Sequence, residues 1–243
     1  MLLIAFFFSA RIFGQTIQDS TINRNLSNKE FYSVLASNKN IKQGKYALFD
    51  FFNGSKICEG FYKNNLKDSL WVFYAHNGLA ADSGYYKEGK KVGVWKAYKN
   101  NGLPQIFYDY TNKQLIYYRP NPESANMLYS VTVGTNKTSV ALDRPPVYLD
   151  GDFEFSLIIT HNINYPAKAR ESMIQGKVFV GFTIDAEGHA SNYKVVRPLG
   201  YDCDEEALKA VKCATGDWLP GLLNGKPVEV DYIIPVGFAL GGF

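Results

Sequence analysis

Apolar residues occupy every second position near the end of the chain. The row consists of Val228, Val230, Tyr232, Ile234, Val236, Phe238 and Leu240, with Glu229 and Asp231 among the residues between them. Strict alternation places such a row on one face of a β-strand. Pro235 lies within this strand and has no N–H to donate, so it is tolerated mainly at sheet edges, strand starts and bulges. We therefore predict a final strand with one free edge, which is either shielded or used to capture another extended chain.

The segments before this strand show helical and strand patterns in turn. Helices are predicted over residues 152–161, 166–174 and 204–214, with Asp202 as a candidate cap of the third. Strands are predicted over residues 177–184 and 190–196, and the less regular alternation of the second indicates a β-bulge. Asn224-Gly225 supplies the turn into the final strand. The expected unit has two or three helices packed on a three-stranded antiparallel sheet.

Residues 45–118 repeat with a period of 24. When residues 60–79 are placed over residues 84–103, nine of twenty positions are identical. Each unit contains an Asn-Gly pair, which suits a tight type I′ hairpin turn. Because a unit of this length cannot bury a face alone, neighbouring hairpins should stack into an antiparallel β-meander. The candidate aromatic face of the meander comprises Tyr62, Trp71, Tyr74, Tyr86, Trp95 and Tyr98. Burial as the core of the sheet is a simpler interpretation of these residues than a platform for a ligand.

Two flanking segments have weaker patterns. Residues 16–44 contain a helix candidate in which Ser27 could cap together with Glu30, so we interpret them as a helical lead-in. Residues 119–143 are rich in Pro, Ser, Thr and Asn, with a short strand candidate in the middle, and we interpret them as a linker. The C-terminal domain then covers residues 144–243. The fold class is α+β.

The first fifteen residues contain an apolar run from residue 2 to residue 8, followed by small residues. This run is too short to span a bilayer and fits the core of a signal peptide, which predicts export to the periplasm or cell envelope. The chain opens without the basic residues of such a peptide, so an upstream start and a buried apolar terminus remain alternatives. Three cysteines, Cys58, Cys203 and Cys213, leave at least one thiol unpaired, and buried free thiols are favoured.

Composition and residue spacing argue against several function classes. A net charge of +3 without a long basic run does not support nucleic-acid binding. His76, His161 and His189 fall on different predicted elements, and no spacing of ligand residues fits a metal site. The densest acidic cluster, residues 202–206, is explained by capping and the helix dipole. We expect no enzyme, no catalytic residue, no metal, no cofactor and no small-molecule substrate.

The pattern GxYxxGxxxGxWxxYxxxGxL over residues 84–103 resembles MORN-type repeats. In the preceding unit Asn65 and Ser69 stand in the places of Gly89 and Gly93, which puts the tightness of that turn in question. Farther on, the pieces YPxxA, QGxVxVxFxIDxxGxA, DEEALxAV, WxPG, NGKPVxV and PVxFxL follow one another between residues 144 and 240. Together they resemble the C-terminal domain of the TonB family.

The TonB resemblance implies a non-enzymatic envelope protein. In that family the domain captures an extended segment of an outer-membrane transporter as an added strand, and transport is coupled to inner-membrane energy. The corresponding edge here is Val228, Glu229, Val230, Asp231, Tyr232, Ile233 and Ile234. The expected partner is an outer-membrane transporter or a similar envelope protein. The alternative is an envelope scaffold that binds partners through its repeat sheet, with the C-terminal domain pairing with itself as a homodimer.

Overall fold

The computed structural model describes residues 16–23, 28–122, 127–134 and 136–240. The chain forms two compact units, Met1–Gly78 with Gly84–Val92 and Leu79–Ser83 with Gly93–Phe243. The division therefore falls within the repeats, and not near Asp143. The predicted signal peptide, residues 1–15, lies outside the described residues.

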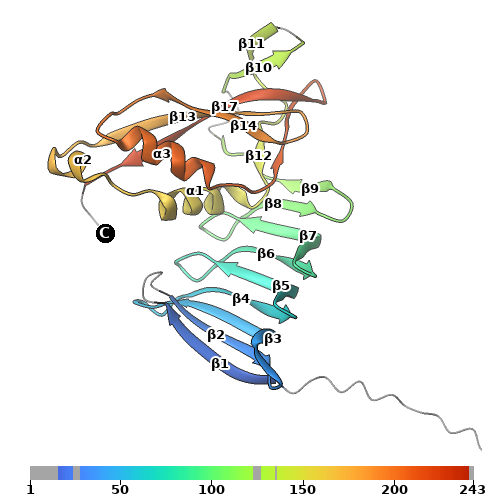
Figure 1. Ribbon diagram of the computed structural model, residues 1–243. Coiled ribbons are helices and arrows are strands. Elements are labelled where there is room, and N and C mark those ends of the chain that lie inside the picture. The colour runs from blue at the N-terminus through green and yellow to red at the C-terminus, as the bar shows by residue number, and fades with distance from the viewer. Residues whose placement is uncertain (1–15, 24–27, 123–126, 135, 241–243) are drawn as a thin grey trace, which may run out of the picture. The chain divides into compact units, whose positions relative to one another are not determined.

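The N-terminal part of the chain is a meander in which neighbours in sequence are neighbours in the sheet (Figure 1). This order confirms the predicted antiparallel β-meander. Its strands are β1 (Thr16–Asn23), β2 (Asn28–Leu35), β3 (Asn38–Asp50), β4 (Lys56–Lys63), β5 (Leu66–Tyr74), β6 (Ala80–Lys87), β7 (Lys90–Tyr98), β8 (Pro104–Asp109) and β9 (Gln114–Tyr118).

The predicted helical lead-in over residues 16–44 is wrong. Residues 16–23 and 28–35 form β1 and β2, and β2 pairs along its length with β1 and β3. The Glu30 carboxylate, expected in a helix cap, instead accepts hydrogen bonds from Lys42 Nζ (3.1 Å) and Tyr46 Oη (2.8 Å) on β3. Pairing with neighbouring strands overrides the local helix signal, which is weak for so short a segment.

The turns of the repeat also differ from the prediction. At the repeat's Asn-Gly pairs only Gly54, Gly78 and Gly102 have positive φ among the described residues, so these turns are not type I′. The Gly78 N–H donates to Ala75 O (2.9 Å), which closes a longer loop. Two-residue turns with two positive φ angles lie at Asn64-Asn65 and Glu88-Gly89 instead. The predicted turn at Asn224-Gly225, with φ of 52° and 70°, has the expected geometry.

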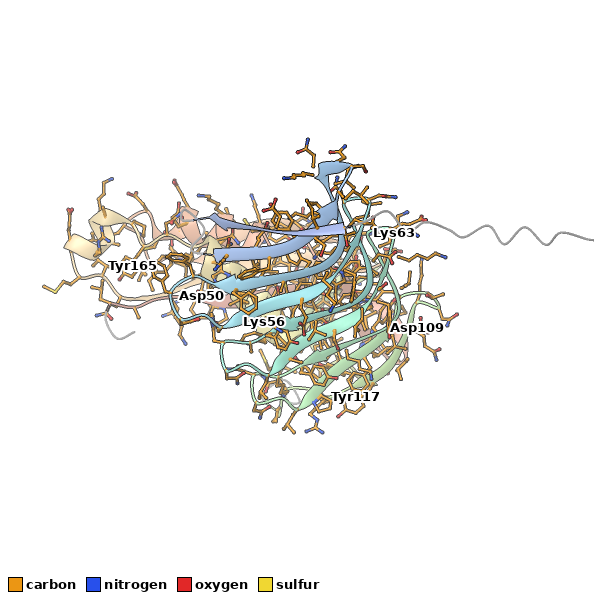
Figure 2. The ribbon with its side chains drawn as sticks, turned by 90° about the horizontal axis from the view of Figure 1, so that it is seen from below. Asp50, Lys56, Lys63, Asp109, Tyr117 and Tyr165 are labelled. Atoms are coloured by element: carbon orange, nitrogen blue, oxygen red, sulfur yellow. The ribbon has the colours of Figure 1, made fainter. Side chains whose placement is uncertain are left out.

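Two aspartates shape other turns of the meander, and both are labelled in Figure 2. The Asp50 carboxylate accepts the N–H groups of Phe52 and Asn53 (both 2.9 Å) after β3. Asp109 likewise accepts those of Thr111 (2.9 Å) and Asn112 (3.1 Å) after β8. The hydrogen bonds from Asn112 lead the causes that hold the pKa of Asp109 below its usual value. Such side-chain hydrogen bonds stabilise the reversal of the chain at each turn.

The C-terminal part combines three helices with a six-stranded sheet of order β11-β10-β17-β13-β14, in which β16 pairs with the beginning of β17. β12 and β15 pair separately. The elements are β10 (Tyr129–Val133), β11 (Asn136–Val140), β12 (Val147–Tyr148), α1 (Gly151–Asn162), α2 (Ala167–Glu171), β13 (Gly176–Ile184), β14 (Ala190–Arg197), α3 (Cys203–Lys212), β15 (Trp218–Leu219), β16 (Gly221–Leu223) and β17 (Lys226–Phe238). The predicted helices and the three predicted strands are all present, but further strands join the sheet.

The core of this part lies between the sheet and the helices. Cys203, Ala207 and Val211 on α3 are buried, and they pack with the inward residues of β13 and β17. The predicted bulge is visible as register shifts between β13 and β14. Asp202 does not cap α3 through its side chain, because it has a φ of 65° and makes no capping hydrogen bond. Asp204 instead accepts the N–H groups of Leu199 (2.8 Å) and Gly200 (3.0 Å), which fastens the loop before the helix.

The interpretation of residues 119–143 as a linker is wrong for its second half. Residues 129–140 form the β10–β11 hairpin, and Tyr129 and Val131 are buried against Val230 of β17. Alternation of Tyr129, Val131 and Val133 was the signal of this hairpin in the sequence.

Two non-glycine residues of the first repeat adopt left-handed backbone conformations at the positions of Gly89 and Gly93. These are Asn65 (φ 65°) and Ser69 (φ 61°). The Asn65 side chain gains hydrogen bonds to β3, since its Oδ1 accepts from Lys42 N–H (2.7 Å) and its Nδ2 donates to Asn40 O (3.2 Å). Ser69 bonds only to the adjacent Asp68 side chain (3.0 Å). The strain at Ser69 is therefore less well compensated.

We predict that Ser69→Gly raises the free energy of unfolding by about 0.5–1 kcal/mol, because glycine adopts positive φ without a steric penalty. Urea denaturation monitored by tryptophan fluorescence measures the effect. Asn65→Gly is the matched control and should be neutral or destabilising, since it loses two hydrogen bonds. A Ser69→Gly variant no more stable than the parent would contradict the assigned strain.

Candidate partner-binding edge

The last strand, β17, separates an inward row from an outward row of side chains. Val230, Val236 and Phe238 are buried, and Tyr232 and Ile234 pack against the same core. Ile233 and Pro235 lie on the outward row and are exposed. This confirms the alternation predicted for residues 228–238.

The prediction that the edge of this strand is free from Val228 to Ile234 is wrong for its first part. One side of β17 pairs with β13 from Val230 to Phe238. On the other side, Glu229–Asp231 pair with β10, and β16 pairs with Lys226–Val228 at the start of the strand. Glu229, Val230 and Asp231 are therefore covered on that side by β10, and Val228 is paired with β16 of the same chain.

The second part of β17 agrees with the inference from Pro235. Among the residues that the structure describes, no strand pairs with the outer side of residues 232–238. Pro235 lies in this segment, opposite Phe179 of β13. Tyr232, Ile233 and Ile234 are thus the members of the predicted site at which the strand has a free side.

The β10–β11 hairpin is fastened to β17 by polar contacts that centre on Asp231. Its carboxylate accepts hydrogen bonds from Ser130 Oγ (2.9 Å), Lys137 Nζ (2.7 Å) and Thr183 Oγ1 (3.3 Å). Burial alone would raise the pKa of Asp231, but the hydrogen bonds from Lys137, Ser130 and Thr183 and the charge of Lys137 outweigh it and hold the pKa below its usual value. The ionised carboxylate therefore joins both strands of the hairpin to β17 and β13.

Tyr232 anchors the strand where the hairpin ends. Its ring lies 5.6 Å from that of Trp218 and 5.7 Å from that of Phe182, and it stacks on Tyr129 at 6.3 Å with an interplanar angle of 4°. Burial raises the pKa of Tyr232. These contacts hold the backbone of β17 rigidly at the boundary between its covered and its free segment.

The six aromatic residues predicted as one face of the repeat lie on two faces. Trp71 contacts Tyr62 (5.2 Å) and Tyr86 (6.1 Å), and Lys67 Nζ lies 4.4 Å from the centre of the Trp71 ring. Tyr74 lies on the opposite face and donates to the Glu59 carboxylate. Burial, followed by the hydrogen bond to Glu59, raises the pKa of Tyr74 to about 12.

The same division holds in the second unit. Trp95 contacts Tyr110 (6.3 Å), whereas Tyr98 contacts Phe107 (6.1 Å), which lies next to Tyr117. Trp71 and Tyr74, like Trp95 and Tyr98, are three residues apart, and an odd spacing places strand residues on opposite faces. The tryptophans are almost fully buried, which supports a core role for their face.

Two residues of the acidic cluster at 202–206 contact neighbouring groups. Asp202 pairs with Lys168 (3.2 Å), and Glu206 accepts the Asn164 N–H (3.2 Å). All three cysteines are free, with Cys58 and Cys203 buried and Cys213 exposed. Within the described residues no group of three or more His, Cys, Asp or Glu side chains could hold a metal ion. None of the described helices has the length and apolar composition needed to cross a membrane.

Comparison with known proteins identifies one domain type. Residues 161–240 match the family model described as Gram-negative bacterial TonB protein C-terminal, which covers less than half of the chain. These residues therefore carry a TonB C-terminal domain, a type that belongs to bacterial envelope proteins and interacts with other proteins. A search of curated proteins found no match.

Two solved structures are similar to parts of the chain. The NMR solution structure of Helicobacter pylori TonB-CTD is 28% identical, covers 37% of this chain and 81% of that chain, and has a TM-score of 0.30. A crystal structure of S. aureus TarM in a mutant form with Fondaparinux is 13% identical, covers 42% of this chain and 21% of that chain, and has a TM-score of 0.25. The domain type rests on the family match and not on these low TM-scores.

We predict that Asp231→Asn loosens the β10–β11 hairpin and lowers the hydrogen-exchange protection of the Val131 amide by about threefold to tenfold, because the charged acceptor shared by the hairpin is lost. Glu229→Gln is the matched control, since it neutralises a nearby acid on the same strand whose carboxylate makes no hydrogen bond to the hairpin among the described residues. Equal effects of the two substitutions would contradict the role assigned to Asp231.

The same contact predicts a pH dependence. Because the folded-state pKa of Asp231 is lowered, its stabilising contribution is present above the unfolded-state pKa, near 3.8, and is lost as the pH falls through the folded-state pKa. The protection factor of Val131 should therefore be nearly constant from about pH 6 to about pH 4 and should fall below about pH 4 more in the parent than in Asp231→Asn. Parallel pH profiles of the two proteins would refute this assignment.

Proposed function

We propose that this protein is a non-enzymatic, periplasmic component of TonB-type transport that binds an outer-membrane transporter or a similar envelope protein. The partner contributes an extended segment, which adds as a strand to the outer side of β17 at residues 232–238. The observation that carries the proposal is the unpaired side of this half-strand within a domain that matches the TonB C-terminal model.

The pairing of β10 with β17 limits where a partner strand can add. A partner strand at Val228–Asp231 would have to displace β10, which buries Val131 fully and stacks Tyr129 on Tyr232. Removing such residues from a packed core costs several kcal/mol, more than a few backbone hydrogen bonds return. The proposed contact is therefore restricted to residues 232–238, where no strand has to be displaced among the described residues.

The direction of the β17 backbone determines which N–H and C=O groups are available to the partner strand. Proline is tolerated in a strand where its nitrogen faces away from the ladder, so we expect the Pro235 nitrogen to face outward. Residues two positions away face the same side, which turns the N–H and C=O groups of Ile233 and Gly237 outward as well. About five hydrogen bonds at roughly 0.5–1.5 kcal/mol each, less the cost of ordering the peptide, suit a transient complex.

We predict that a peptide with a transporter's TonB box shifts the amide signals of Ile233 and Gly237 in NMR spectra of the full chain, and leaves that of Val230 nearly unchanged. Ile233→Pro removes an outward donor and should weaken peptide binding at least tenfold. Ile233→Ala, which keeps the N–H but removes the exposed side chain, is the matched control and should bind within about threefold of the parent. Tryptophan fluorescence verifies that both variants fold.

The alternative, an envelope scaffold whose C-terminal domain pairs with itself, gives a different result in the same experiment. If the peptide does not bind at millimolar concentration, strand capture at this edge is refuted. A concentration-dependent dimer in light scattering that Ile233→Pro abolishes would then favour self-pairing.

A further inference from the structure

The two faces of the sheet formed by β2 to β5 are closed to different extents. On one face the Trp71 indole lies directly over Gly60, where an added Cβ would come within 2.3 Å of the ring. Lys42 and Lys67 cover the aromatic rings of this face, and Trp71 is 1% exposed. The face is therefore packed and sealed by its own residues.

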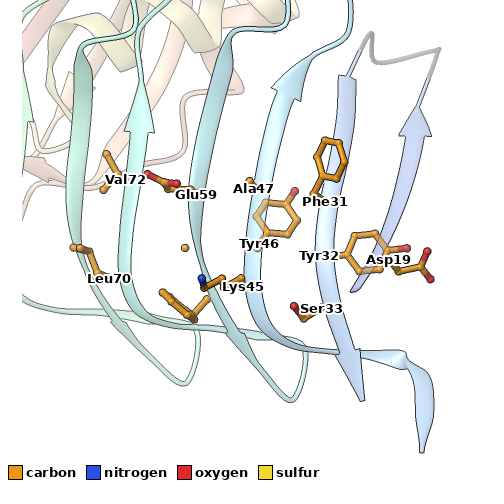
Figure 3. Close-up of a pocket in the computed structure, with 12 residues that line it drawn as sticks. Asp19, Phe31, Tyr32, Ser33, Lys45, Tyr46, Ala47, Glu59, Leu70 and Val72 are labelled. Carbon is orange, nitrogen blue, oxygen red and sulfur yellow. The ribbon is translucent and has the colours of Figure 1, made fainter. Parts of the chain in front are cut away.

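The opposite face contains an open hollow, shown in Figure 3. Its volume is about 750 Å³. The hollow exists because small groups, namely Ser33, Ala47 and the Gly60 backbone, lie between larger side chains. Phe31, Phe61 and Leu70 line the walls and are 42%, 41% and 42% exposed. A cluster of large, exposed apolar side chains of this kind indicates a binding surface.

The charged side chains that line the hollow differ in whether they have partners in the structure. Glu59 is engaged, because its carboxylate accepts from Lys56 Nζ (2.8 Å) and from the Tyr74 hydroxyl. Asp19, on β1, also takes part in an interaction. Lys45 is exposed and has no ion-pair partner among the described residues. Lys45 is therefore a cationic group beside the apolar walls that is available to pair with an anion.

We propose that this hollow binds a monomeric anionic amphiphile, an acyl chain with a terminal carboxylate. The acyl chain packs on Phe31, Phe61 and Leu70 over the small floor, and the carboxylate pairs with Lys45 Nζ. The volume falls within the range of about 300–1,000 Å³ that is usual for small-molecule sites. An apolar ligand without an anionic group would leave Lys45 unpaired, and a cationic one would be repelled by it.

Isothermal titration of the full chain with dodecanoate, below its micelle concentration, tests this site. We expect saturable binding with a stoichiometry of one, and at least tenfold weaker binding of dodecyltrimethylammonium. Ala47→Phe places a ring in the hollow and should weaken dodecanoate binding at least tenfold. Lys45→Glu should weaken it about tenfold, whereas Lys39→Glu, which reverses an exposed charge on the same strand outside the hollow, should change it less than twofold.

Several outcomes would overturn the proposal. Absence of saturable dodecanoate binding, or equal binding by Ala47→Phe with its fold intact in thermal melts, would exclude the hollow as the site. Binding only to phosphatidylglycerol vesicles would mean a membrane surface and not a monomeric ligand. A dimer in light scattering that Ala47→Phe dissociates would mean that a second copy covers this face.

Discussion

Backbone hydrogen bonding along β17 is the constraint on which the C-terminal part of the molecule depends. A strand inside a sheet must pair its N–H and C=O groups on both sides or leave them to water. β17 meets this requirement differently along its length, since β13 pairs with residues 230–238 on one side while β10 covers only residues 229–231 on the other, and β16 pairs with residues 226–228. Pro235 falls in the half that has one neighbour, where a missing donor costs nothing.

The β10–β11 hairpin widens the expected three-stranded sheet and limits the length of β17 that can pair with a partner strand. Its attachment combines apolar burial of Val131 with a carboxylate, Asp231, that accepts from both strands of the hairpin. Neither contribution alone would hold a two-stranded hairpin, which is marginally stable by itself in water. The capture site we propose is consequently shorter than the strand that forms it.

The repeat sheet also has one closely packed face and one open face. In the unit that contains β2 to β5, tryptophan over glycine, with lysines over the aromatic rings, closes one face. The other face combines small residues with exposed Phe31, Phe61 and Leu70. Because alternate residues of each strand serve different faces, the repeat can maintain its core while the opposite surface varies.

The sequence by itself determined the elements whose patterns are long and regular. Alternation in β17 and β13, the periodicity of α3, the Asn224-Gly225 turn and the 24-residue repeat were all readable, because each depends on neighbours close along the chain. Even the division of Trp71 and Tyr74 between two faces follows from their odd spacing. Only the tertiary structure decided that residues 28–35 form a strand, that residues 129–140 join the sheet, and which half of β17 stays free. These outcomes depend on pairing between segments up to about a hundred residues apart, as in the contact of Ser130 with Asp231, and local patterns carry no information about such partners.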